Sequence, residues 1–273
     1  MRRSCSILVA LLLTACTGAA GTAPTPDAES ANQRRADPVD RRCAWPSEPA
    51  VIARHGSAAL EMWELAASPV LDRPVVPDDP AYLRFRAAIR RAGADRVRPV
   101  ADRPASSSDE LREMWRREDR NAELVHGRVV GRLRPISCLE ALVFAHQHRR
   151  HDEIAHPTEF LVSILRRRAG GQMRLRIYFT AGAEMFPPKQ LYGFDLIERD
   201  RAAGWELLAV LHNHTVQQNG GRPALGQPVP STSDVALLRG LAADLGMVEA
   251  RVTNGFYTVD VPVAELDRLE TRE

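Results

Sequence analysis

The sequence has few of the features that mark nucleic-acid-binding or integral membrane proteins. Aromatic residues make up only 5% of the 273-residue chain, and the formal net charge is +2. No basic patch is interleaved with aromatic residues, so we expect no DNA or RNA partner. The apolar run Ile7–Leu13 is too short to cross a bilayer as a permanent helix. Internal repeats, phosphate-binding loops and nucleophile elbows are also absent.

The N-terminus instead has the order of segments that is typical of a secretion signal. The basic residues Arg2 and Arg3 precede the apolar run, and small residues precede Cys16. Leu13-Thr14-Ala15-Cys16 resembles the lipobox of bacterial lipoproteins, which implies cleavage before Cys16 and a lipid attached to it. An ordinary signal peptide followed by a chance cysteine is the alternative. We therefore expect residues 1–16 to be a signal peptide and Cys16 to anchor the protein to a membrane.

This export signal predicts a location in the cell envelope. Thr17 stands where many lipoproteins of the inner membrane have aspartate, so we expect the outer membrane, facing the periplasm, in a Gram-negative cell. Residues 17–42 are rich in Ala, Gly, Pro, Thr and Asp, which predicts a flexible tether. Beyond it only Cys43 and Cys138 remain, and an oxidising envelope permits a disulfide between them. Two buried free thiols are the alternative, because pairing cannot be deduced from sequence.

Residues 43–136 are predicted to form a mainly helical region. Apolar residues recur at helical spacing over residues 51–67, and the acidic pair before Pro80 is a helix-start signal. Ser137 is the expected cap of a further helix. The predicted helices cover residues 51–67, 80–91, 108–120 and 138–148.

The histidines near the end of the last of these helices are a poor candidate for a metal site. On a helix, residues two apart point about 200° apart, so His146 and His148 cannot share an ion. His148, His151 and Asp152 can share one face of a helix. A solvated basic helix end is nevertheless the interpretation that we prefer for this segment.

Residues 156–262 have the pattern of a compact α/β unit. Gly170-Gly171 and Asn254-Gly255 are turn signals typical of hairpins, and residues 235–246 are predicted to form a helix that ends at Gly246. The predicted strands cover residues 160–165, 174–180, 206–212, 248–253 and 256–261. The expected fold class is therefore α/β, with a mixed β-sheet flanked by helices and preceded by the mainly helical region.

Two histidines stand at the end of one predicted strand. Side chains alternate between the faces of a strand, so His212 and His214 point to the same side and Asn213 points to the other. Asp234 opens the next helix, from which its carboxylate can fold back as a third ligand. Three such ligands leave one position of a tetrahedral zinc ion open to water, which is the layout of a catalytic site. A lone His-x-His pair, by contrast, is more often surface or loop histidine.

The sequence His212-x-His214, a gap, and Ser231-x-x-Asp234 resembles the signature of the JAMM/MPN (JAB-type) metalloproteases. The resemblance implies that the two histidines and Asp234 bind Zn²⁺. It also implies that Ser231 helps to stabilise the tetrahedral intermediate. The implied fold is a JAMM/MPN-like mixed sheet flanked by helices, in a metalloprotease domain over residues 137–273.

The family also has a glutamate upstream, which acts as general base on the zinc-bound water. The segment His156-Pro157-Thr158-Glu159, with the apolar residues after it, resembles the corresponding segment of prokaryotic JAMM proteins. The resemblance alone assigns the role of base to Glu159. Composition and spacing would not have selected this carboxylate, and a strand-entry glutamate that faces water is the alternative.

The loop between the two motifs departs from the family pattern. Sixteen residues separate His214 from Ser231, about twice the usual number in the family, and Thr215 replaces a common proline. The insertion is polar and rich in turn-forming residues. It either lies over the cleft as a specificity loop or misplaces Asp234. We favour the first, because loops tolerate insertions while the elements that they join keep their positions.

These motifs predict a zinc-dependent peptidase or isopeptidase of the cell envelope. A zinc-activated water would attack an amide bond, with Glu159 as the general base. The expected partners are a peptide or protein substrate and the membrane that holds the lipid anchor. The sequence predicts neither the identity of the substrate nor an oligomeric state. The alternative function is that of a catalytically inactive JAMM-fold lipoprotein that acts in binding or as a scaffold.

Overall fold

The structure is a computed structural model that describes residues 42–95, 108–214, 216–219 and 222–271. The predicted signal peptide, Cys16 and the tether up to residue 41 lie outside the described residues. Among the residues described, no helix combines the length and the apolar character that crossing a membrane requires.

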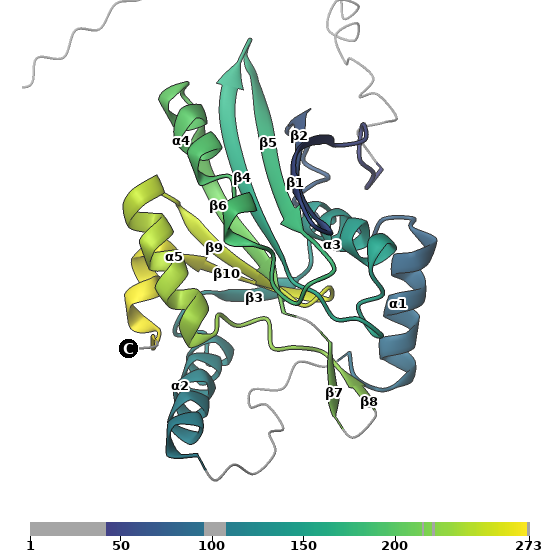
Figure 1. Ribbon diagram of the computed structural model, residues 1–273, viewed down its shortest axis with the longest axis vertical. Helices are drawn as coiled ribbons and strands as arrows, with labels where there is room; N and C mark the ends of the chain where they lie inside the picture. The colour runs from purple at the N-terminus through teal and green to yellow at the C-terminus, as the bar shows by residue number, and fades with distance from the viewer. Residues whose placement is uncertain (1–41, 96–107, 215, 220–221, 272–273) are drawn as a thin grey trace, which may run out of the picture. The chain divides into compact units, whose positions relative to one another are not determined.

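The strands of the described residues form two sheets. Those of the main sheet are β1 (Ala50–His55), β2 (Ala58–Ala66), β3 (Arg132–Pro135), β4 (Phe160–Ala169), β5 (Gln172–Ala181), β6 (Glu206–Asn213), β9 (Glu249–Thr253) and β10 (Tyr257–Pro262). Their order across the sheet is β1-β2-β5-β4-β6-β9-β10-β3 (Figure 1). Neighbouring strands are antiparallel except for the parallel pair β6 and β9. A small second sheet pairs β7 (Gln217–Asn219) with β8 (Arg222–Ala224).

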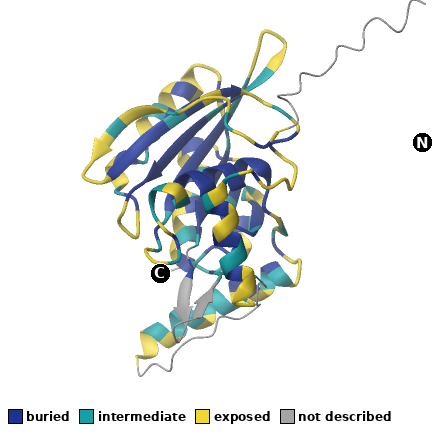
Figure 2. Cartoon of the chain, turned by 90° about the vertical axis from the view of Figure 1, so that its right-hand side faces the viewer, coloured by how far each residue is buried: buried dark blue, intermediate teal, exposed yellow. Residues whose placement is uncertain are grey.

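Helices cover both faces of the main sheet (Figure 1). They are α1 (Pro80–Arg91), α2 (Asp109–His126), α3 (Cys138–Arg150), α4 (Phe194–Ala202) and α5 (Thr232–Leu245), with short 3₁₀ helices η3 (Lys189–Leu191) and η4 (Val263–Arg268). Apolar side chains of α1 and α3, such as Phe85 and Phe144, pack against one face of the sheet. Those of α2, α4 and α5, such as Leu238, pack against the other. Figure 2 shows the central strands buried between these two layers.

The α/β fold class predicted from the sequence is confirmed, and each strand predicted between residues 156 and 262 is present. β4 and β5 extend further than predicted and meet in a turn at Gly170 and Gly171, whose φ angles are 56° and 79°. This left-handed backbone favours glycine, which has no Cβ to clash. The helices predicted over residues 80–91 and 138–148 match α1 and α3 closely, and Gly246 ends α5 as expected, whereas α2 continues to His126, beyond its predicted end at residue 120.

The predicted helix over residues 51–67 is wrong, because this segment forms the β1–β2 hairpin around Gly56. β2 lies between β1 and β5, and Trp63 and Leu65 point into the core while Glu64 is exposed. Their spacing therefore follows the two-residue period of a strand. Pairing with β5, which is distant in sequence, outweighs the local helix propensity of Leu, Met and Glu. The hairpin makes this part of the predicted helical region a piece of the main sheet.

A disulfide joins Cys43 to Cys138, whose Cα atoms lie 5.6 Å apart. The sequence left open whether these cysteines are bridged or free, and the structure contains the bridge. Cys138 is the first residue of α3, so the bridge ties the chain before β1 to the start of this helix. It closes a loop of 95 residues, which restricts the unfolded chain strongly.

Removing this bridge with the double substitution Cys43→Ala/Cys138→Ala is expected to lower the free energy of unfolding by about 2–4 kcal/mol. The reason is the entropy that the unfolded chain regains when the long loop opens. Urea denaturation with and without a thiol reductant measures the effect. The reductant should destabilise the wild-type protein and leave the double variant unchanged. Equal stability of the wild type in both conditions would contradict a structural disulfide.

Candidate metal centre

His212, His214 and Asp234 bring three potential ligand atoms together. The Nε2 atoms of the two histidines lie 3.1 Å apart. Oδ2 of Asp234 lies 3.1 Å from Nε2 of His214 and 3.3 Å from Nε2 of His212. Ligand atoms on a tetrahedral zinc ion, with bonds of about 2 Å, are separated by about 3.3 Å. The triangle therefore has the size required for three protein ligands of one ion, with a fourth position open.

The end of β6 places both histidines on one face of the sheet. β6 pairs with β4, and Leu161 stands opposite His212. Val210, two residues earlier, packs in the layer that contains α5. Because side chains alternate, His212 and His214 lie on this α5 side and Asn213 points to the opposite face. The candidate ligands therefore meet between the end of β6 and the start of α5.

A capping box holds Asp234 at the start of α5. Ser231 is the N-cap residue, and its Oγ accepts a hydrogen bond from N of Asp234 at 3.2 Å. In return, N of Ser231 donates to Oδ2 of Asp234 at 2.7 Å. This reciprocal pair is the usual result of Ser-x-x-acid at a helix N-terminus. It turns the carboxylate back toward His212 and His214, so the long loop before Ser231 does not misplace Asp234.

The backbone carbonyl of Gln227 orients His214. Nδ1 of His214 lies 2.5 Å from this oxygen. A carbonyl only accepts hydrogen bonds, so Nδ1 carries a proton and Nε2 is the atom that can bind an ion. Gln227 belongs to the inserted loop, and Gly226 next to it accepts a hydrogen bond from Nδ2 of Asn254 at 2.9 Å. The described end of the insertion is thus tied to the sheet and directs a candidate ligand; Thr215, Gly220 and Gly221 lie outside the described residues.

The charges of the cluster favour a bound cation. Burial lowers the pKa of His214, but the hydrogen bond and charge of Asp234 outweigh burial and raise this pKa to about 9. Burial raises the pKa of Asp234, but the two histidines outweigh it and hold this pKa well below its ordinary value. Positive charge beside Asp234 therefore stabilises its carboxylate. A divalent ion supplies that charge in place of the proton on His214 Nε2, so metal binding would release a proton.

Glu159 lies just before β4, next to the cluster. Phe160 packs against Phe144 of α3, so alternation directs Glu159 to the α5 side, where the candidate ligands are. Burial raises the pKa of Glu159, the charges of His214 and His212 oppose this rise, and the charge of Asp234 adds to it. Glu159 thus interacts electrostatically with each candidate ligand. A carboxylate of raised pKa in such a place has the proton affinity that a general base requires.

Ser231 has a structural role that the family resemblance did not imply. Its Oγ caps α5, and it also lies 3.0 Å from Oγ of Ser233. When Ser233 is the donor in this contact, the proton of Ser231 remains available for another acceptor. A hydrogen bond to a substrate oxygen is therefore compatible with the cap.

The histidines of α3 are not part of the cluster. His146 is buried, and its Nε2 lies 2.7 Å from Oε2 of Glu61 on β2. Nδ1 of His148 accepts a hydrogen bond from N of Glu153 at 3.2 Å. The prediction of a solvated helix end is wrong for His146, because β2 joins the sheet and brings an acidic partner against α3.

Sequence reasoning missed two residues that support the cluster. Gln227 contributes a backbone carbonyl, and no side-chain pattern could reveal it. Asn213 did carry a signal, because alternation directs this polar side chain into the core on the other face. A buried amide needs hydrogen-bond partners, and those of Asn213 are the backbone groups on either side of Glu159.

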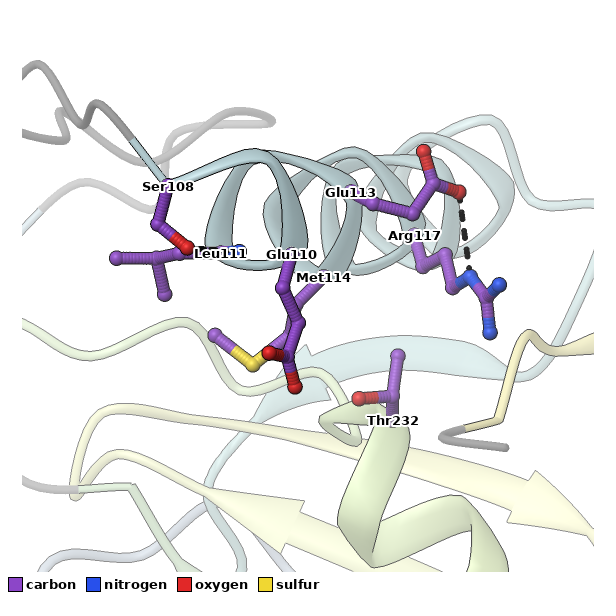
Figure 3. A pocket seen from close by; sticks show the side chains of 7 residues that line it. All are labelled: Ser108, Glu110, Leu111, Glu113, Met114, Arg117 and Thr232. Atoms are coloured by element: carbon purple, nitrogen blue, oxygen red, sulfur yellow. Dashed lines mark hydrogen bonds and ion pairs between the residues drawn. The ribbon is translucent and has the colours of Figure 1, made fainter.

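A cavity of about 510 Å³ lies between α2 and the first residue of α5 (Figure 3). Its wall combines apolar and charged side chains. The lining residues are Ser108, Glu110, Leu111, Glu113, Met114, Arg117 and Thr232. Figure 3 shows Glu110 and Met114 extending from α2 toward the side on which Thr232 of α5 lies. Because Thr232 directly follows Ser231, the cavity borders the helix terminus that holds Asp234.

The cluster combines ligand atoms for one cation with a carboxylate that can accept a proton. Such a set can bind a divalent ion and activate water beside it, which is the chemistry of metal-dependent hydrolysis. Comparisons of the chain with protein-family models, with curated proteins and with solved structures found no match.

Proposed function

We propose that this protein is a zinc-dependent peptidase or isopeptidase of the JAMM/MPN type. The observation that carries the proposal is the triangle of His212, His214 and Asp234, with sides of 3.1 to 3.3 Å. Its size suits ligands of one tetrahedral ion, and Glu159 lies next to it. The sequence resemblance to the JAMM motif supports the same assignment of roles.

Zinc fits this donor set better than Mg²⁺ or Ca²⁺ does. Two imidazole nitrogens and one carboxylate are typical of catalytic zinc sites, whereas Mg²⁺ and Ca²⁺ prefer oxygen ligands alone. The hydrogen bond from His214 Nδ1 to the Gln227 carbonyl supports a metal role, because metal-binding histidines usually donate their second nitrogen in this way.

The residues around the ion would divide the work of amide hydrolysis. When bound, zinc supplies the Lewis acidity that makes a water molecule nucleophilic near neutral pH. Glu159 accepts the proton of the attacking water and later delivers it to the leaving amine. Ser231 donates a hydrogen bond to the oxygen that becomes negatively charged. The cavity beside Thr232 gives room for part of a substrate chain.

The cell envelope is the proposed location, and a lipid on Cys16 is the proposed anchor. The disulfide between Cys43 and Cys138 supports an exported protein, because disulfides persist in oxidising compartments and are rare in the cytosol. A peptide or protein of the same compartment is therefore the proposed substrate.

Metal titration of the purified protein tests the proposal. We expect one zinc ion per chain at micromolar concentration, measured by calorimetry and by elemental analysis after gel filtration. The double variant His212→Ala/His214→Ala should lose this ion. His55→Ala is the matched control, because His55 is exposed on β1. Absence of divalent metal binding in the wild type, or binding that survives the double substitution, would end the proposal.

A further inference from the structure

Asn213 lies between the two candidate ligands on β6 and points to the opposite face of the sheet. Its side chain is fully buried, with 0% of its surface exposed. Oδ1 accepts a hydrogen bond from N of Phe160 at 2.7 Å, and Nδ2 donates one to O of Thr158 at 2.9 Å. A single side chain thus holds the backbone on both sides of Glu159.

We call these two hydrogen bonds the Asn213 clamp. They begin where the backbone hydrogen bonds between β4 and β6 end. The paired register of β4 and β6 stops at Leu161 and His212. Beyond that point, N of Phe160 and O of Thr158 are buried groups that need partners. An amide supplies a donor and an acceptor on two neighbouring atoms. A carboxylate lacks the donor, and an aliphatic side chain lacks both.

The rest of this segment is also held through its backbone and through Thr158. N of Glu159 donates to O of Met185 at 2.8 Å. Oγ1 of Thr158 donates to Oε1 of Glu153 and accepts from Nε2 of Gln147, both at 2.6 Å. Within the described part of the chain, the Glu159 carboxylate itself has no hydrogen-bond partner. The backbone that carries Glu159 therefore sets the position from which its side chain extends toward the cluster.

We propose that Asn213 is a positioning residue that fixes Glu159 relative to the metal ligands. The inference rests on the proposed function. Because His212 and His214 flank Asn213 at the end of β6, the strand end that presents the ligands also fixes the base. Displacement of a catalytic group by about 1 Å can cost about 100-fold in rate. Loss of the clamp should therefore lower kcat, leave KM nearly unchanged and leave zinc bound.

The test compares Asn213→Ala with the matched control Asn121→Ala. Asn121 is also 0% exposed, and it also clamps backbone: Nδ2 donates to O of Glu270 at 3.1 Å and Oδ1 accepts from N of Glu270 at 2.7 Å. Both substitutions remove two hydrogen bonds from a buried amide side chain to backbone, but Asn121 belongs to α2 and holds the chain near its C-terminus. If the alanine variant does not fold, Asn213→Ser replaces it. The serine side chain is polar but too short to reach both backbone partners.

The first readout needs no substrate. With Co²⁺ as the probe ion, the carboxyl carbon of ¹³C-labelled Glu159 should show a large paramagnetic shift, identified by its loss in Glu159→Gln. In Asn213→Ala we expect a smaller shift and a broader signal for the Glu159 carboxyl carbon. In Asn121→Ala we expect both to stay unchanged. Amide exchange at Phe160 should accelerate only in the Asn213 variants. Removing a hydrogen-bond partner of a metal ligand typically lowers metal affinity about 10–100-fold. The Asn213 variants should change zinc affinity much less than this.

The second readout is hydrolysis of internally quenched peptide libraries with α-linked and lysine ε-linked amide bonds. We expect kcat to fall about 100-fold in Asn213→Ala, with KM and zinc occupancy retained, and to stay near wild type in Asn121→Ala. An unchanged Co²⁺ shift of Glu159, or a kcat loss that merely follows zinc loss, would overturn the inference. An inactive wild type would reject the proposed function instead, while the Co²⁺ shift would still decide on the clamp.

Discussion

The substitution Glu159→Gln is expected to lower turnover by about 10²- to 10⁴-fold, the usual contribution of a general base. Glutamine has the size and polarity of glutamate but cannot accept the proton of the attacking water. Glu159 is absent from the triangle of ligand atoms, so the variant should bind zinc with the affinity of the wild type. Loss of turnover with retained metal is thus the signature of a base, as opposed to a ligand.

Kinetics on the α-linked and ε-linked peptide libraries, with zinc content measured on the same samples, checks this prediction. Glu206→Gln is the matched control, because Glu206 is an exposed residue at the far end of β6, where it pairs with Arg166. The control should keep full activity. Zinc loss in Glu159→Gln would make Glu159 a ligand, and undiminished turnover would remove it from the mechanism. A wild type that binds zinc but cleaves nothing would favour the alternative of an inactive binding or scaffold protein.

The candidate site could be predicted from the sequence wherever its geometry is local. Alternation along one strand places His212 and His214 on one side, and Ser231 at a helix start turns Asp234 back through a capping box. Both rules act within a few residues. The convergence of β6 with α5 is the step that needed the fold, because the long insertion left two arrangements open.

The prediction of secondary structure and of side-chain partners failed where contacts between distant parts of the chain determine them. Residues 51–67 have apolar positions that fit a helix and a strand alike, and the choice depends on pairing with β5 more than 100 residues away. The same error hid the partner of His146, since Glu61 reaches α3 only as part of a sheet strand. Likewise, the hydrogen bonds of Asn213 are made to a segment more than 50 residues earlier, so the sequence indicated which way this side chain points but not its partners.

Arg134 on β3 pairs with two buried carboxylates, and removing it is expected to destabilise the fold strongly. Its guanidinium donates to both oxygens of Glu140 on α3 at 2.6 and 2.9 Å, and to both oxygens of Asp260 on β10 at 2.6 Å. The side chain of Glu140 is 0% exposed and that of Asp260 is 6% exposed. Arg251 contributes longer contacts of 3.5 Å to Glu140 and 3.8 Å to Asp260.

The substitution Arg134→Met is therefore expected to lower the free energy of unfolding by about 3–5 kcal/mol, the usual cost of leaving buried charge without its partner. Burial raises the pKa of Glu140, but the hydrogen bonds and charge of Arg134, with Arg251, outweigh burial and lower this pKa. A lowered pKa in the folded state means stability that is present above the unfolded pKa and lost on acidification. The Arg134→Met variant lacks this contribution. The difference in free energy of unfolding between the wild type and the variant should therefore be largest at neutral pH and smaller in acid.

Urea denaturation at neutral and acid pH measures this dependence. Arg132→Met is the matched control, because Arg132 contacts the same Asp260 at 3.1 Å but has a side chain that is 76% exposed. Because the Arg132 guanidinium stays largely in water, this contact should contribute about 1 kcal/mol or less, so the control should unfold almost as the wild type does. Adding Glu140→Gln and Asp260→Asn to Arg134→Met should recover part of the loss, because the carboxylates no longer carry charge. If the loss in free energy of unfolding is independent of pH and remains when Glu140→Gln and Asp260→Asn are added, Arg134 stabilises the fold through packing and not through its charge.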